Sequence, residues 1–448
     1  MVSAASFDAA AVKALAQRAG DPGWLADRRL QAFERFEALP WPDPSVEAWR
    51  YSKLDGFDLS DFRPGMGEHP VVDAPGKIHA DVQAQMTIAG ERSGQAVQVD
   101  ADMVHVSADP ALAAKGVIVA SLSRAAADHE ELVREILGAA GVTASDEKLQ
   151  TLTASFAGAG LFVYVPAGVD VPLPIRSFRY ITAAGRAAFA HTVVVAEEGS
   201  SVTVIEHLRS PHLSGSALSA STTEIHARQA ANVSVLTVQD YGPTLWHFST
   251  ARAVIDRDAT VRTLAATLGG RFSRSVVESI LQGAGSYSEM LGVYFGDSAQ
   301  HFDNRSLQEH IAPSTKSDLY YKGALKGYST SVYSGLIHIA KEAQGTDAWQ
   351  ANRNLILSEH SKADSIPYLE IEANDVRCAH GASVGPPDDD VLFYLNSRGL
   401  DPAAAERLVV KGFFQEVLDR LRVPEVREIL EVAIEAELAL DDAEGPGA

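Results

Sequence analysis

Residues 197–208 read EEGSSVTVIEHL, a polar turn followed by a run in which apolar and polar side chains alternate. The same arrangement returns as QAANVSVLTVQD (229–240), DRDATVRTLAAT (256–267) and GAGSYSEMLGVY (283–294). The alternating runs begin near Val202, Val233, Val261 and Tyr287, at intervals of 31, 28 and 26 residues. Alternation at period two indicates β-strands. A drifting repeat of this length is typical of a parallel β-helix, in which each coil stacks on the last.

Almost every segment between Leu161 and Cys378 is of β type, rich in Val, Ile, Thr and Tyr and broken by short polar turns. No amphipathic insert of helical length interrupts this region, which disfavours a sheet built from strand–helix–strand units. A β-sandwich would show strand spacings of about 8–12 residues and hairpin turns such as Asn-Gly or Asp-Gly. These dipeptides are absent from the region. The sequence therefore predicts a mainly β fold with a parallel β-helix core.

The segments before and after this core have mainly helical sequence patterns. Before it, helical patterns cover residues 1–40, 123–137 and 147–156, with short strands expected at 83–89, 96–99 and 116–120. After it, helices are expected at 391–397, from Asp401-Pro402 and from Pro424, and the last of them has an acidic outer face and tail. We therefore expect three regions: an N-terminal helical and mixed α/β region (1–150), the β-helix core (151–385) and a C-terminal helical domain (386–448).

The composition sets limits on the function. The chain has 448 residues, 46% of them hydrophobic, and a formal net charge of −21. The electric field of such a negatively charged chain repels nucleic acid and anionic membranes, so neither is expected as a partner. A single cysteine permits no disulfide within the chain, which fits a reducing compartment. The N-terminus lacks the pattern of a signal peptide, and no stretch reaches the length of a membrane span, so a cytoplasmic location is expected.

The single cysteine has a histidine two residues away. Cys378 and His380 lie in an extended-type segment, and a strand sends residues i and i+2 to the same face. Thiolate and imidazole are ligands for zinc, iron and iron–sulfur clusters. Because two ligands are half a coordination shell, a site here would need further ligands from another chain or from a transient substrate. The alternative is that Cys378 is a small buried apolar residue.

Common catalytic motifs are absent from the sequence. It contains no P-loop, no G-x-G-x-x-G and no H-E-x-x-H. In the β region, three Glu-His pairs, at 206–207, 309–310 and 359–360, are interpreted as hydrogen-bonded surface pairs, with metal or acid–base roles as the alternative. A β-helix enzyme that cleaves carbohydrate would need clustered carboxylates, whereas the acidic residues here are scattered along the sequence.

The segment from Pro367 to Leu400 resembles the C-terminal signature of the SufB/SufD family of iron–sulfur cluster assembly proteins. The matching residues are Pro367, Leu369-Glu370-Ile371, DVRCAHGASVG (375–385) and LFYLNSRGL (392–400). Supporting matches are Trp49-Arg50-Tyr51, Val204-Ile205-Glu206-His207 and Asn352-x-Asn354-Leu355. The SufB branch would carry Glu-His-Glu-Ala where this chain has Ala-His-Gly-Ala (379–382), so the resemblance favours the SufD branch.

This resemblance implies a right-handed parallel β-helix between helical end regions, in a non-catalytic scaffold that binds no nucleotide itself. It implies pairing with SufB along a β-helix edge, with Cys378 and His380 at the interface where a transient iron–sulfur cluster is shared. It also implies docking of the ATPase SufC by the C-terminal helical domain. The docking residues would be Val391, Phe393, Tyr394, Leu395, Arg398 and Gly399, although Phe393, Tyr394 and Leu395 suit interior packing as well.

Two other functions stay open at this point. One is a SufB-like primary cluster scaffold, and the other, less expected, is a β-helix carbohydrate-active enzyme. The sequence also leaves open whether the chain forms a homodimer in isolation and whether a flavin joins the complex.

Overall fold

The computed structural model of the chain describes residues 7–439 except 53, 66–68, 74, 79, 89 and 142–146. The acidic tail residues Asp441, Asp442 and Glu444 therefore lie outside the described residues. The helices are α1 (Ala9–Ala19), α2 (Gly23–Ala38), α3 (Ala80–Ile88), α4 (Pro110–Ala113), α5 (Leu122–Asp128), α6 (Glu130–Ile136), α7 (Lys148–Phe156), α8 (Asp389–Ser397), α9 (Pro402–Leu418) and α10 (Pro424–Ala439).

The strands are β1 (Arg63–Pro64), β2 (Gly94–Val99), β3 (Asp102–Ala108), β4 (Ile118–Ser121), β5 (Leu161–Val165), β6 (Ile175–Tyr180), β7 (Arg186–Ala196), β8 (Ser201–Arg209), β9 (Ala217–Ala227), β10 (Asn232–Asp240), β11 (Leu245–Ile255), β12 (Thr260–Thr267), β13 (Phe272–Leu281), β14 (Tyr287–Gly296), β15 (His301–His310), β16 (Lys316–Leu325), β17 (Thr330–Ile339), β18 (Thr346–Ile356), β19 (Lys362–Ile371) and β20 (Val376–Gly385).

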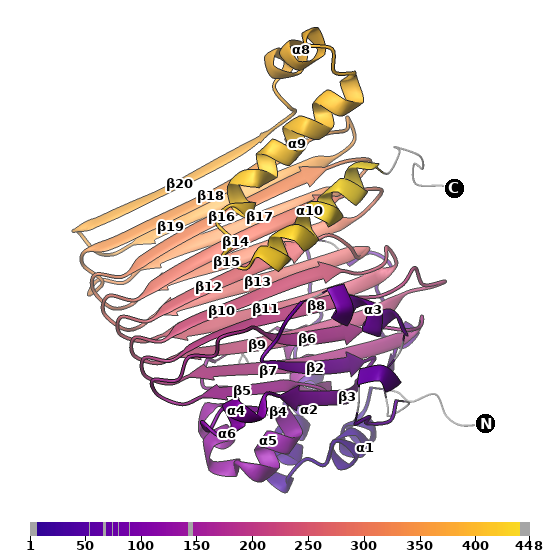
Figure 1. The fold of residues 1–448 in the computed structure, drawn as a ribbon, viewed down its shortest axis with the longest axis vertical. Coiled ribbons are helices and arrows are strands. Elements are labelled where there is room, and N and C mark those ends of the chain that lie inside the picture. Colours follow the sequence, from indigo (N-terminus) through magenta and orange to yellow (C-terminus); the bar gives the residue numbers. More distant parts are fainter. Residues whose placement is uncertain are drawn as a thin grey trace.

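From β5 onward the chain alternates between two stacked parallel sheets (Figure 1). Sheet A has the order β19-β17-β15-β13-β11-β9-β7-β5-β4, and sheet B has the order β20-β18-β16-β14-β12-β10-β8-β6-β2-β3. Each turn thus gives one strand to each sheet, and β5 to β20 make a parallel β-solenoid of about eight turns. The predicted parallel β-helix core is confirmed.

The repeat that predicted the solenoid is the inward row of sheet B. Val202 pairs with Val233, and Val233 with Val261, and all three are buried between the sheets. The fourth position of the repeat is wrong by one residue: Val261 pairs with Ser288, not Tyr287. Ser288 lies inward because it is in register with Val261, and its hydroxyl donates to Ser279 across the interior at 2.7 Å.

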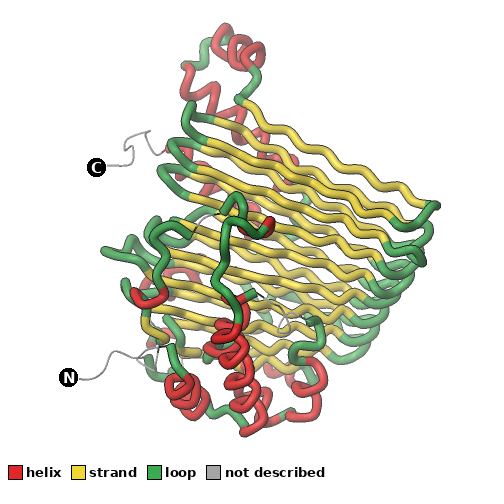
Figure 2. The backbone as a smooth tube through the Cα atoms, turned by 180° about the vertical axis from the view of Figure 1, so that it is seen from behind, coloured by secondary structure: helices red, strands yellow, loops and turns green. Residues whose placement is uncertain are grey.

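The first end of the solenoid is closed. Antiparallel β3 and β4 terminate sheets B and A, and Val72 donates its backbone N–H to Val104 on the outer edge of β3. Leu112 and Val117, from the segment between these strands, are buried in the apolar interior. Helices α1, α2 and α7 pack their apolar residues against sheet A in the same part of the molecule (Figure 2). Buried apolar residues and helices therefore close the interior at this end, where the edge strands β3 and β4 are short and antiparallel.

The strands of the N-terminal region extend the same two sheets, so this region is continuous with the solenoid. Strands predicted at 96–99 and 116–120 correspond to β2 and β4, but the strand predicted at 83–89 is wrong, since Ala80–Ile88 is helix α3. Val82 and Met86 are one helical turn apart and both pack on Phe178 and its neighbours. The division at residues 150 and 385 remains a proposal.

Helices α9 and α10 lie across the outer face of sheet B (Figure 1). Their buried side chains are Ala405, Val410, Phe414, Val417, Leu418, Val426, Leu430 and Ile434. Polar contacts fix α9 in place: buried Lys322 donates to Glu416 at 2.8 Å and to the Phe413 carbonyl. Arg420 binds Glu289 at 2.9 Å and also Asp318. The predicted helices from Pro402 and from Pro424 are confirmed.

Glu437, near the end of α10, links the stability of the fold to pH. Burial, with Asp240 and Asp297 nearby, raises the pKa of Glu437 to about 7 from its ordinary 4.5. The folded chain therefore holds this proton more tightly than the unfolded chain, and the free energy of unfolding falls as pH rises from about 5 to above 7. We expect Glu437→Gln to stabilise the protein at pH 8 by about 1–3 kcal/mol and to have little effect at pH 5.

Urea denaturation at pH 5, 6, 7 and 8 measures this effect. Glu431→Gln, at an exposed position on the same helix, is the matched control and leaves the pH dependence unchanged. A Glu437→Gln variant with the pH profile of the wild-type chain would contradict the prediction.

Candidate functional site

Cys378 and His380 lie on β20, the last strand of sheet B. Cys378 pairs with Ala348 and His380 with Gln350, and both of these neighbours on β18 are fully buried between the sheets. Since residues in register on parallel strands share a face, Cys378 and His380 both belong to the inward row. Cys378 is half-buried and His380 is exposed, because no further turn stacks on β20 among the described residues.

The thiol of Cys378 contacts the apolar interior of the last turn. Its side chain packs against the cluster formed by Ile337, Ile339 and Ala348. This burial raises the pKa of the Cys378 thiol, so the group is a protonated thiol at neutral pH until a metal ion or a nearby cation stabilises the thiolate. Cys378 therefore lies at the edge of the apolar interior, and His380 lies on its solvent side.

The inward rows of the last turn also carry exposed apolar side chains. Leu369 and Ile371 on β19 pair with the buried residues Ile337 and Ile339, yet they are 37% and 41% exposed. Val384 on β20 is 46% exposed, although its neighbour Asn354 is buried. Side chains in the same rows of earlier turns are covered by the following turn. We call Leu369, Ile371, Cys378, His380 and Val384 the open end.

The backbone of the open end is also uncovered. Within the part of the chain that the structure describes, β19 and β20 each have a neighbouring strand on one side only. Their outer N–H and C=O groups form two free parallel edges, which another chain can complete. Figure 1 shows these edges at the end of the solenoid opposite the N-terminal helices.

Helix α8 projects beyond the open end and contacts only α9 closely (Figure 1). Asp388 caps its N-terminus by accepting from the backbone N–H of Asp390, and Gly399 ends it with φ of 95°. None of its residues is buried, and Phe393 is 74% exposed. Tyr394 is exposed as well, with the Arg398 guanidinium 5.1 Å from its ring centre. Interior packing of Phe393 and Tyr394 is therefore excluded.

The remaining residues of the predicted docking set are distributed along the same helix. Val391 is exposed, Leu395 is half-buried, and Arg398 and Gly399 are exposed at the C-terminal end. The structure brings all six predicted residues together on α8 and its end. It places them apart from the solenoid interior, where Cys378 and His380 lie.

The interpretation of the Glu-His pairs as surface pairs is wrong for two of them. Glu206 is buried and accepts from Arg179, Thr192 and Thr237, while His207 points to the opposite face and stacks on Phe178. Burial lowers the pKa of His207 to about 3. His310 is fully buried with Thr315 and Ser317 as partners. Neighbours in a strand face opposite ways, so these pairs do not act together.

Two comparisons with known proteins agree with this architecture. Residues 178–413 match the family described as SUF system FeS cluster assembly, SufBD core domain, and residues 13–176 match the SufBD protein N-terminal region. The chain belongs to the SufB/SufD family. The core-domain match covers most of the solenoid together with α8 and the first part of α9. Proteins of this family are iron–sulfur cluster assembly subunits rather than enzymes.

Individual relatives support the same assignment. The iron–sulfur cluster assembly protein SufD of Bacillus subtilis is 29% identical over 431 residues, covering 96% of this chain and 98% of that protein. A SufBD family protein of Mycobacterium leprae is 36% identical over 303 residues, or 66% and 74% of the two chains. One from Mycobacterium tuberculosis is 38% identical over 290 residues, or 63% and 70%. In the described part of this SufB/SufD family member, no helix has the length and apolarity to cross a bilayer.

Proposed function

We propose that the chain is the SufD-type scaffold subunit of the cytoplasmic SUF complex, which pairs with SufB through the open end and docks the ATPase SufC through α8 and α9. The observation that carries the proposal is the asymmetry of the solenoid. Its first end is closed by β3, β4 and buried apolar residues, whereas the last turn leaves inward apolar side chains and two strand edges in solvent. An unfinished interior of this kind is expected where another solenoid stacks.

The cluster is cargo at this interface. Cys378 and His380 offer one sulfur and one nitrogen ligand from adjacent inward positions of the edge strand. An iron–sulfur cluster needs about four protein ligands, so the partner would supply the rest. Iron would bind the thiolate, so the Cys378 thiol, whose pKa burial raises, would release its proton to solvent on binding.

The docking proposal for SufC is supported by the exposure of α8. Phe393, Tyr394 and Val391 present an apolar surface with Arg398 at its edge, on a helix that contributes nothing to the core. Exposed aromatic residues beside an arginine are typical of binding hot spots. Because α9 is fixed to sheet B by Lys322 and Arg420, a movement imposed on α8 and α9 would reach the solenoid.

The role of the Cys-His pair is tested by cluster yield. In the complex co-expressed with SufB and SufC, we expect Cys378→Ala or His380→Ala to lower the yield of assembled cluster by about tenfold, the scale of losing a metal ligand. The complex itself would still form, because alanine adds neither charge nor bulk to the open end. Iron and sulfide analysis and visible absorption of the purified complex measure the yield.

Ser383→Ala serves as the control, because Ser383 is an exposed residue on the opposite face of β20. Unchanged yield from both active-face variants would leave the pair with a structural role only. A stable cluster on the chain purified alone would instead favour the alternative of a SufB-like primary scaffold. A homodimer in isolation would indicate that the open end pairs with its own copy when SufB is absent.

A further inference from the structure

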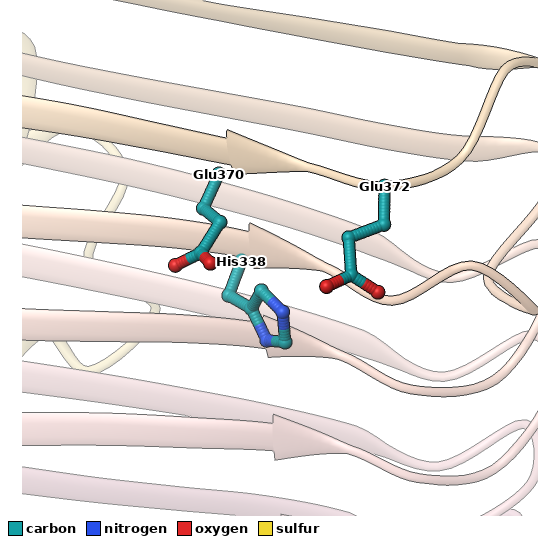
Figure 3. A group of neighbouring side chains, drawn as sticks. All are labelled: His338, Glu370 and Glu372. Carbon is teal, nitrogen blue, oxygen red and sulfur yellow. The ribbon is translucent and has the colours of Figure 1, made fainter.

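Three potential metal ligands meet on the outer face of sheet A, near the open end but outside it. They are His338 on β17, Glu370 on β19 and Glu372 just after β19. Figure 3 shows Glu370 and Glu372, from β19 and the loop after it, extending toward His338 on the neighbouring strand. One ligand atom from each residue lies within 4.8 Å of the other two.

The strand register creates this meeting point. His338 pairs directly with Glu370, and on its other side with Glu309, so an imidazole lies between two carboxylates in one outward row. Glu372 follows Glu370 by two residues and so returns to the same face. The Glu309 Oε1 atom is 3.7 Å from His338 Nδ1, which is an ion-pair distance and longer than a hydrogen bond. His338 is half-buried, while Glu370 and Glu372 are exposed.

The two carboxylates have no cationic partner to hold them together. Among the described residues, neither Glu370 nor Glu372 forms an ion pair with a lysine or arginine. Like charges on neighbouring outward positions repel each other. A bound cation would remove this repulsion. The nearby imidazole of His338 determines which kind of cation binds best.

We propose that His338, Glu370 and Glu372 bind a divalent transition metal ion of the zinc class, such as Zn²⁺ or Fe²⁺. One imidazole nitrogen with two carboxylate oxygens suits these ions, whereas Mg²⁺ and Ca²⁺ prefer oxygen ligands alone. Water completes the coordination shell on the exposed side. Glu309 acts in the outer shell by orienting the imidazole, as carboxylates do beside metal-bound histidine.

This centre is distinct from the Cys378–His380 site. Cys378 and His380 lie on the inward face of sheet B, whereas His338 and Glu370 lie on the outward face of sheet A. The two sites can therefore be separated by mutation. A Cys378→Ala/His380→Ala background removes the other set of ligands and leaves the proposed centre intact.

Isothermal titration of Zn²⁺ into the chelator-treated full chain, in that background, tests the proposal. We expect one ion to bind per chain. His338→Ala and, with the shape of the side chain preserved, Glu370→Gln should each weaken binding of Zn²⁺ by at least about tenfold, the lower end of losses seen even for outer-shell changes. An anomalous-scattering map from zinc-soaked crystals should place the ion between the three side chains.

The matched control is Glu359→Gln/His360→Ala, an exposed Glu-His pair in the turn between β18 and β19. It should bind Zn²⁺ as the background does. Binding of Zn²⁺ that His338→Ala and Glu370→Gln leave unchanged would overturn the assignment, as would the absence of a bound equivalent. Circular dichroism of each variant confirms that the fold is kept, which the exposure of the carboxylates leads us to expect.

Discussion

Lysine in place of both Leu369 and Val384 is expected to abolish pairing of the chain with SufB. These residues occupy inward rows of β19 and β20, so a stacked partner would bury both ammonium groups without a counter-charge. We expect the affinity to fall at least about 100-fold, or about 3 kcal/mol. The free chain should lose less stability than affinity, because Leu369 and Val384 are already 37% and 46% exposed before pairing.

Co-purification with tagged SufB and surface plasmon resonance measure the loss, and urea denaturation of the isolated chain checks the fold. Val432→Lys is the matched control: it places the same charge on an apolar residue that is 71% exposed on α10, away from the open end. Full affinity of the Leu369→Lys/Val384→Lys variant would show that pairing uses another surface.

The second large effect is expected inside the solenoid. Arg179→Met should destabilise the fold by about 3–5 kcal/mol, because it leaves the carboxylate of Glu206 buried without its cation. The side chains of Arg179 and Glu206 are only 6% and 3% exposed, and the remaining partners of Glu206 are the hydroxyls of Thr192 and Thr237. The midpoint of guanidinium denaturation measures the change.

Two variants make this test specific. Arg124→Met removes an arginine from the exposed pair with Asp128, whose side chains are 72% and 43% exposed, and should cost less than about 1 kcal/mol. Adding Glu206→Gln to Arg179→Met should restore part of the lost stability, since the neutral amide costs less to bury than an unpaired carboxylate. Equal effects of Arg179→Met and Arg124→Met would refute a special role of the buried pair.

The sequence predicted the solenoid because sheet B keeps a visible row of inward aliphatic residues. It did not reveal two strands per turn, because sheet A hides its alternation. β9 is buried at every position, since helix α7 and the backbone at Gly138, which donates to Glu224, cover the outer face of this strand. The strand misassigned at 83–89 has a related origin. Small and polar residues alternate in this part of the sequence as they would in a strand, whereas the structure packs Val82 and Met86 of α3 in one cluster with Phe178.

One geometric expectation of the sequence is confirmed: Cys378 and His380 share a strand face, because residues two apart in a strand point the same way. The roles of this pair and of the six residues on α8 and its end stay predictions. Sequence reasoning missed the group around His338, because Glu370 is 32 residues further on and meets it only through the register of β17 and β19. A histidine and a glutamate separated by one coil of the repeat form the sequence pattern that could have revealed this group.

The closed first end sets a limit on assembly. A rod with adhesive surfaces at both ends would grow head to tail into filaments whose length rises with concentration. In this protein β3, β4 and the buried plug of Leu112 and Val117 remove one of the two adhesive surfaces. If the chain pairs through its open end as proposed, growth stops once two rods have met, and the closed end sets the stoichiometry of the complex.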